Sequence, residues 1–358
     1  MEKIKRFFEC LIPESNCNLK CSYCYLIQTN RRTEKRVKFD YSPEDIGRAL
    51  TKSRLGGTCY FSICAIGETL IPNEIIEIIY ILLKNGHYIN ITTNGTLSKR
   101  FDQIISFPKE FKERLNISFS FHYLELKKLN LLKSFFDNIN KIKKEEISFL
   151  LQFNLCDEYL EHLDEIKKLC SENIGLLPQV ALTRDVRTKN IKIESEKDFE
   201  EYCKIGNEFN SNLFEFTCEN FMKKRKEFCY AGDWSNILNL GTGELKKCYA
   251  FFESQNIFEN PSKKIKFEGI GNSCQDPYCI NSSHFLSLGV IPNLKTSTYY
   301  KLRSRENEKN YSQKMRSFLN SKLNESNYEY NIFRKKYINI KNKKLDLKIK
   351  RYLYQLLK

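Results

Sequence analysis

Cys17, Cys21 and Cys24 stand close together near the start of the sequence, in the spacing C-x3-C-x2-C. This spacing allows one short loop to present three thiolates to a single centre. An Fe4S4 cluster needs a ligand on each of its irons, and cysteine thiolates usually supply them. Three thiolates would therefore leave one iron open to a small molecule.

A structural zinc site and three unrelated buried thiols are the alternative interpretations. Structural zinc sites are closed by four ligands, and their motifs usually combine two nearby pairs of ligands. No cysteine or histidine lies within thirty residues after Cys24, and Cys10 on the other side belongs to an apolar run. The spacing therefore favours an iron–sulfur cluster.

The motif resembles the iron–sulfur motif of the radical S-adenosylmethionine (radical SAM) superfamily. The resemblance implies that Cys17, Cys21 and Cys24 are metal ligands and that S-adenosylmethionine chelates the remaining iron of a [4Fe-4S] cluster. It also implies that the reduced cluster cleaves this cofactor to a 5′-deoxyadenosyl radical, which removes a hydrogen atom from a substrate. An electron donor such as flavodoxin or ferredoxin is implied as a partner.

The elements that must position this loop alternate between strand and helix. Strands are predicted at 7–12, 58–65, 88–93, 116–122, 148–154 and 177–183, and helices at 43–54, 75–84, 127–143 and 158–172. Such alternation indicates parallel strands joined by right-handed crossovers. Six units fall short of the eight in a closed TIM barrel. The radical SAM family uses a six-unit barrel, so we expect an α/β fold with a partial (β/α)6 TIM-like barrel.

The residues after the second and third strands are candidates for binding the cofactor, because active sites of parallel barrels lie at the carboxyl ends of their strands. Gly67 and Glu68 stand in a segment that resembles the family's Gly-Gly-Glu-Pro motif, although Ile66 and Thr69 depart from it. The resemblance implies that Gly67 and Glu68 meet the amino group of S-adenosylmethionine. An ordinary strand-to-helix turn is the alternative.

Thr93 and Asn94 open the segment Thr-Asn-Gly-Thr, which is frequent after the third strand in the family. The pair Asn-Gly alone is only a turn signal. The resemblance implies that both residues belong to the cofactor site.

Polar side chains also alternate along the fourth strand. Ser118, Ser120 and His122 share one face there, and the apolar residues between them share the other. The apolar face should meet the covering helices, so the polar face should line an interior cavity. His122 could bind substrate or shuttle a proton, and a hydrogen-bonded structural histidine is an equal alternative.

The fifth strand repeats this arrangement with Gln152 and Asn154. The resemblance implies that Ser120, Gln152 and Asn154 contact the ribose, carboxylate or adenine of the cofactor. Tyr23 occupies the aromatic position before the third cysteine, which packs near adenine in the family.

A second cysteine group follows the predicted barrel. Cys229, Gly243 and Cys248 stand in the spacing C-x13-G-x4-C around a predicted hairpin, and Cys274 and Cys279 follow. The pattern resembles the opening of SPASM and twitch domains, which hold auxiliary clusters. Further cysteines of a full SPASM domain are absent after residue 279, so the resemblance is to the shorter, twitch-like form.

These four thiolates would suit one fully ligated second [4Fe-4S] cluster. The C-x4-C spacing of the last pair, Cys274 and Cys279, departs from the tighter spacing common in the family. A structural zinc site with four cysteines is the alternative for this group.

Composition limits the remaining possibilities. The chain has 358 residues and 14 cysteines, no apolar run long enough to span a membrane, and no signal-peptide pattern at its start. We therefore expect a cytoplasmic protein whose thiols serve metal or redox chemistry, because the cytosol keeps thiols reduced. The predicted domains are a barrel at 1–210, an auxiliary-cluster domain at 211–285, and a basic, mostly helical extension at 286–358 that docks loosely or is surface-exposed.

Three functions are compatible with these features. The favoured one is a radical SAM oxidoreductase acting on a small molecule or a peptide, by oxidation, epimerisation or cross-linking. Only sixteen residues precede Cys17, which leaves no room for a peptide-recognition domain and favours a small substrate. Residues 301–358 carry a net charge of +12 out of +15 for the chain, which suggests an RNA-modifying enzyme as an alternative. A non-catalytic metal-binding scaffold is the third possibility; nucleic acid as a partner is not favoured.

Overall fold

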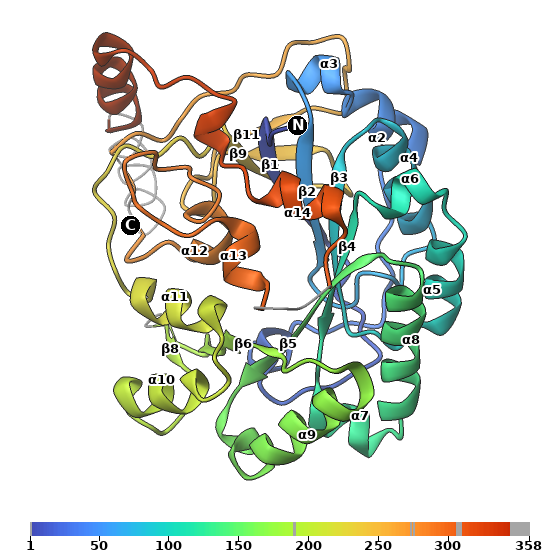
Figure 1. The fold of residues 1–358 in the computed structure, drawn as a ribbon. Coiled ribbons are helices and arrows are strands. Elements are labelled where there is room, and N and C mark those ends of the chain that lie inside the picture. Colours follow the sequence, from blue (N-terminus) through green and yellow to red (C-terminus); the bar gives the residue numbers. More distant parts are fainter. Residues whose placement is uncertain (1, 189–190, 273, 275, 306–309, 344–358) are drawn as a thin grey trace.

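The computed structural model describes residues 2–188, 191–272, 274, 276–305 and 310–343. One nine-stranded sheet organises it, in the strand order β11-β10-β9-β1-β2-β3-β4-β5-β6 (Figure 1). The six strands of the barrel are parallel to their neighbours, as predicted. They are β1 (Arg6–Ile12), β2 (Cys59–Ala65), β3 (Tyr88–Thr93), β4 (Leu115–Ser120), β5 (Ser148–Leu155) and β6 (Gln179–Leu182). The predicted α/β fold with a partial barrel is confirmed.

Helices cover the outer face of this curved sheet, among them α4 (Ile75–Lys84), α5 (Ser98–Ile105), α8 (Leu132–Lys144) and α9 (Leu163–Ile174) (Figure 1). The apolar face of β4 points toward them, because Phe119 stacks on Phe101 of α5 and Phe121 stacks on Phe135 of α8. The alternation of polar and apolar residues along β4 therefore identified its two faces correctly.

Two predicted elements end earlier than expected. The fourth strand stops at Ser120, and His122 instead precedes α7 (Tyr123–Lys128), so His122 is not a strand residue. The predicted helix 43–54 is divided into α2 (Pro43–Ala49) and α3 (Lys52–Leu55). Thr51 causes this break, since its extended backbone and its side-chain hydroxyl cap the start of α3.

The concave face of the sheet is filled by the chain after residue 280. Helices α12 (Ser282–Phe285), α13 (Tyr299–Arg303) and α14 (Gln313–Leu319) lie there (Figure 1). Phe318 stacks on Tyr88 of β3 with ring centroids 3.7 Å apart, and Tyr299 meets Tyr60 of β2 at 5.3 Å. Burying one such aromatic side chain contributes roughly 1.5–3 kcal/mol. The prediction of a loosely docked segment was therefore wrong for this part of the chain.

The second cysteine group belongs to the same sheet as the barrel. Strand β9 (Ser235–Asn239) pairs in parallel with β1, and β10 (Glu244–Lys246) and β11 (Ser254–Asn256) continue the sheet antiparallel. The hairpin of β9 and β10 was predicted. The boundaries at 210 and 285 stay a prediction.

The remaining described elements are short or connect the barrel to its C-terminal part. They are α1 (Tyr25–Gln28), α6 (Lys109–Lys112), η1 (Asp157–His162), β7 (Arg184–Asp185), β8 (Lys192–Ile193), α10 (Phe199–Asn207), α11 (Asn212–Asn220) and η2 (Leu323–Glu325). No helix in the described ranges has both the length and the apolar content required to cross a membrane.

Candidate active site

The three-thiol loop leaves β1 at its carboxyl end. Cys21 is buried, Cys17 and Cys24 are half-buried, and the amide of Cys24 donates to the carbonyl of Cys21 at 3.1 Å. Burial raises the pKa of the Cys17 thiol to about 11 and raises the pKa of Cys21 well above its usual value; the negative charge of the neighbouring thiolates adds to both shifts. Cys17 and Cys21 therefore lie within electrostatic reach of the neighbouring thiols, but no three such side chains of the described residues converge on one metal position, and their assignment as one ligand set stays a prediction.

Gly67 is pressed against this loop. Its amide donates to the carbonyl of Glu14 at 2.5 Å, and the next amide, of Glu68, donates to the carbonyl of Asn16 at 2.9 Å. A β-carbon on Gly67 would overlap the backbone of Asn16. The turn after β2 therefore fits the cysteine loop only with glycine at this position.

The Glu68 carboxylate connects the ends of β2 and β3. One oxygen accepts from the Thr93 hydroxyl at 2.6 Å and the Leu70 amide at 3.0 Å, and the other accepts from the Asn94 amide at 2.8 Å. The side chain is 2% exposed, and burial raises its pKa although these hydrogen bonds oppose the shift. Glu68 and Thr93 thus hold the two strand ends together.

Asn94 reaches the cysteine loop directly. Its side-chain amide donates to Asn18 Oδ1 at 2.8 Å and lies 3.7 Å from Cys17 Sγ. Its own Oδ1 accepts from the amide and the hydroxyl of Thr96, which fixes the orientation of the side chain. Amide donors to ligand sulfurs tune iron–sulfur clusters. The sequence showed Asn94 as a turn residue, and its contact with Cys17 could not be read from it.

Tyr23, which is buried, and His122, which is half-buried, form a pair beside the same loop. Tyr23 Oη lies 2.6 Å from His122 Nδ1 and 3.2 Å from the Tyr159 hydroxyl. Burial lowers the pKa of His122 to about 4, so the ring is neutral at physiological pH. This geometry matches the alternative in which His122 is a hydrogen-bonded structural histidine. In that role His122 orients the Tyr23 side chain.

A polar cavity of about 240 Å³ opens on the concave side of the sheet near the carboxyl ends of the strands. Gln152 and Asn154 line it, as their inward face predicted. Thr92 lines it as well, whereas Ser120 and Thr93 are not among its lining residues. Sequence reasoning missed Thr92; its register opposite Ser118 was the available signal, because paired residues share a face.

Below this cavity the barrel interior is also polar, and its buried polar side chains form hydrogen bonds with one another. Asn90 Oδ1 accepts from the Asn116 side-chain amide at 2.6 Å and from the Ser118 hydroxyl at 2.7 Å. Asn90 Nδ2 donates to Ser62 at 3.1 Å. Buried polar groups paired in this way stabilise the cavity floor.

The second cysteine group encloses a much smaller space. Cys229, Cys248, Cys274 and Cys279 all line a cavity of about 40 Å³. Burial raises the pKa of each thiol, that of Cys248 to about 12. Among the residues that the structure describes, no three His, Cys, Asp or Glu side chains converge closely enough to bind a single metal ion. The assignment of these thiols as one ligand set therefore stays a prediction, supported by their common cavity.

The two cavities adjoin each other. Tyr278, Ile280 and Asn281 line both of them. A molecule in the polar cavity would thus lie beside the four-thiol cavity.

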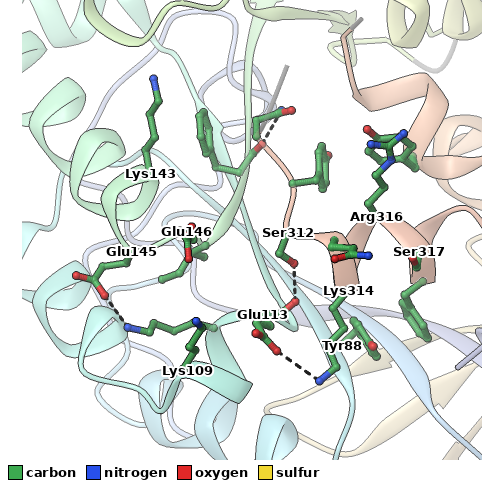
Figure 2. Close-up of a pocket in the computed structure, with 18 of the residues that line it drawn as sticks. Tyr88, Lys109, Glu113, Lys143, Glu145, Glu146, Ser312, Lys314, Arg316 and Ser317 are labelled. Atoms are coloured by element: carbon green, nitrogen blue, oxygen red, sulfur yellow. Dashed lines mark hydrogen bonds and ion pairs between the residues drawn. The ribbon is translucent and has the colours of Figure 1, made fainter. Parts of the chain in front are cut away.

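A larger pocket of about 990 Å³ lies elsewhere, at the amino ends of the strands (Figure 2). Its charges are largely paired, since Lys112 meets Glu145 at 2.6 Å and Lys314 meets Glu113 at 3.5 Å. It contains none of the candidate site residues, whereas Gln152 and Asn154 line the smaller cavity. We therefore place the active site in the smaller cavity, at the opposite edge of the sheet.

The fold and this site together define a partial-barrel protein with a cysteine loop after its first strand. Residues 11–170 match the sequence profile of the "Radical SAM superfamily". Over these residues the chain is similar to the radical SAM superfamily, a similarity that implies a [4Fe-4S] cluster and S-adenosylmethionine.

Solved structures resemble the fold at low sequence identity. A crystal structure of Streptococcus suis SuiB bound to S-adenosylmethionine matches with a TM-score of 0.50 and 17% identity, over 72% of this chain and 64% of that chain. A structure of histidine-tagged anSMEcpe with bound AdoMet has a TM-score of 0.48 and 17% identity, over 72% and 77% of the two chains. The chain thus spans less than two thirds of SuiB. No curated protein sequence matches it at a significant level.

Proposed function

We propose that this enzyme reductively cleaves S-adenosylmethionine and abstracts a hydrogen atom from a substrate bound in the 240 Å³ cavity. The observation that carries the proposal is the contact of Gly67 and Glu68 with the three-thiol loop. This contact supports the proposal, because the segment that resembles the family's cofactor-binding motif meets the backbone of the loop that carries the three thiols. When bound, the cluster and S-adenosylmethionine would supply the electron and the organic radical.

The side chains around the loop would have different roles in binding and in orientation. Cys17, Cys21 and Cys24 would hold three irons, and Asn94 would donate to the sulfur of Cys17. Gln152 and Asn154 face the cavity and would bind polar groups of the cofactor or substrate. Tyr23, held by His122, is placed to pack near the cofactor. Ser120 stays a candidate cofactor contact at the end of β4.

The four-thiol group would hold a second [4Fe-4S] cluster, with Cys229, Cys248, Cys274 and Cys279 as ligands. Its cavity adjoins the polar one, so this cluster could accept an electron from a substrate radical. Such a transfer would make net oxidation or cross-linking of a small molecule or peptide possible. Flavodoxin or ferredoxin would supply the reducing electron to the first cluster.

The experiment is anaerobic reconstitution with iron and sulfide, followed by incubation with S-adenosylmethionine and dithionite. About eight irons per chain and formation of 5′-deoxyadenosine are expected, because each Fe4S4 cluster holds four irons. A preparation that binds only zinc, or one that holds iron but forms no 5′-deoxyadenosine, would overturn the proposal. Titrating the reduced enzyme with flavodoxin tests the electron donor separately.

A further inference from the structure

The polar cavity contains a buried cation without an acidic partner. Arg303 is 3% exposed and lies on α13, where its guanidinium donates to the carbonyl and the hydroxyl of Ser283 at 3.0 and 3.3 Å. The guanidinium also lies 3.6 Å from the ring centroid of Tyr299. No described acidic side chain forms an ion pair with it. Buried arginines are normally paired with an acid, because an uncompensated buried charge is costly.

A second arginine faces the same cavity. Arg184 lies on β7, and its backbone carbonyl accepts from Gln28, but its guanidinium forms no hydrogen bond or ion pair with the described residues. The cavity lining contains these two arginines and no aspartate or glutamate. An approaching molecule therefore meets a positively charged wall.

One carboxylate, that of Glu9, lies behind this wall within electrostatic reach of both arginines, and it can compensate at most one of them. Glu9 is 8% exposed; one of its oxygens accepts from Asn281, a cavity residue, at 2.5 Å, and the other has no hydrogen-bond partner. Burial raises the pKa of Glu9, which favours its neutral form. Even with Glu9 ionised, two cations face one anion.

We propose that Arg303 and Arg184 form an anion-binding site that takes a carboxylate of the substrate. This inference rests on the proposed function, and it specifies the substrate as a molecule with at least one anionic group. A guanidinium presents a planar fork of donors that matches the two oxygens of a carboxylate. The bound carboxylate would supply the missing partner of Arg303.

The position of the site favours the substrate over S-adenosylmethionine as the source of the carboxylate. Arg303 and its partners Ser283 and Tyr299 belong to the segment that continues from the four-thiol group, whereas Arg184 contacts Gln28, just after the three-thiol loop, through its backbone carbonyl and not its guanidinium. S-adenosylmethionine also carries two positive groups against one carboxylate, so two arginines would repel the cofactor as a whole.

The first experiment uses the reconstituted full-length enzyme and acetate as the probe. A ligand that binds only the native state raises the unfolding temperature, because it stabilises that state by RT ln(1 + [L]/Kd). We expect potassium acetate to raise this temperature relative to potassium chloride at equal ionic strength. The Arg303→Gln and Arg184→Gln variants should lose this rise. Arg48→Gln, which removes an exposed surface ion pair, should retain it.

If Arg303→Gln fails to fold, Arg184→Gln still tests the site, because Arg184 is only half-buried. An equal acetate effect in wild-type enzyme and Arg184→Gln, or no acetate effect in wild-type enzyme, would overturn the proposal.

The second experiment separates the two sources of carboxylate. Equilibrium dialysis of S-adenosylmethionine should give a dissociation constant for Arg184→Gln within about twofold of wild type. A loss of about tenfold or more would assign the arginines to the cofactor and overturn the inference. Formation of 5′-deoxyadenosine by wild-type enzyme is measured in parallel, so a failure of the proposed function is seen independently of the acetate result.

Discussion

The two cysteine groups of this molecule differ in how completely they can surround a cluster. The first presents three thiols on a loop after β1, and a polar cavity of about 240 Å³ opens near the carboxyl ends of the neighbouring strands. The second presents four thiols around an enclosed space of about 40 Å³. Three thiols leave one iron of a cluster available to a small molecule, whereas four close every position. The number of thiols therefore underlies our proposal of chemistry for the first group and electron transfer for the second.

The largest expected effect comes from removing a thiol of the first group. Cys21→Ala should lose about half of the iron and reduce 5′-deoxyadenosine formation by at least about a hundredfold, because the cluster then lacks a ligand. Iron analysis and chromatography of the products measure both quantities. Cys170→Ala, at a buried thiol on α9 outside both groups, is the control and should keep both values.

Removing a thiol of the second group should affect the iron content but not the cleavage of S-adenosylmethionine. Cys279→Ala should also lose about half of the iron, yet it should still cleave S-adenosylmethionine, because the first cluster is intact. If Cys279→Ala abolished cleavage as completely as Cys21→Ala, the proposed division between the two groups would be wrong.

Gly67→Ala should damage the first group without touching a ligand. The added β-carbon would overlap the backbone of Asn16, and overpacking of this kind typically costs about 1–3 kcal/mol. We expect incomplete cluster loading at the first group and unchanged loading at the second. Gly175→Ala serves as the control for a positive-φ glycine with open space around it. Normal loading of both clusters in Gly67→Ala would show that the contact with the loop is adaptable.

Asn94→Ala should change the potential of the first cluster more than its occupancy. The variant loses the amide donor to Cys17, so the oxidised cluster is favoured and the midpoint potential should fall by on the order of tens of millivolts. Spectroscopic redox titration measures the potential of each cluster. A fall confined to the second cluster would contradict the assignment.

The smallest effect concerns the pH dependence of stability near the first group. The pKa of His122 is lowered to about 4 in the folded protein, whereas an unfolded histidine titrates near 6.5. The unfolded state therefore binds more protons between these values, and the free energy of unfolding should decrease by about 2 kcal/mol as the pH falls from 6.5 to 4. His122→Asn should flatten this dependence in denaturant titrations relative to wild type. An equal slope in both proteins would show that His122 is not buried as a neutral ring.

Local patterns predicted much of the barrel and its first cysteine loop. The strands followed from alternating or continuous apolar runs, and the face of β4 that carries Ser118 followed from period-2 spacing. His122 was misplaced because the same alternation continues past the residue at which pairing with β5 ends. The roles of Glu68 and Asn94 depend on contacts between separate strand ends, which spacing along the chain does not encode.

Long-range packing accounts for the rest. The pairing of β9 with β1 joins residues more than two hundred positions apart, and neither strand alone specifies its partner. Met315 and Phe318 stand among lysines and asparagines, so their burial inside the barrel was hidden by the composition of the tail. Arg184 and Arg303 lie in unrelated segments, and only the folded chain brings them to one cavity.

The register between β1 and β9 also fixes how far apart the two cysteine groups lie. Leu11, near the end of β1, pairs with Asn239, at the end of β9. The first cysteine group follows β1, whereas Cys229 precedes β9 and Cys248 follows β10, so both of these thiols lie toward the amino end of β9. Adjacent strands in a sheet keep a spacing of about 4.8 Å and resist sliding. The rate of electron tunnelling falls steeply with distance. A shared sheet would hold the distance between the two groups fixed, so the tunnelling rate would not vary. For the two proposed clusters, electron transfer would then need no domain closure.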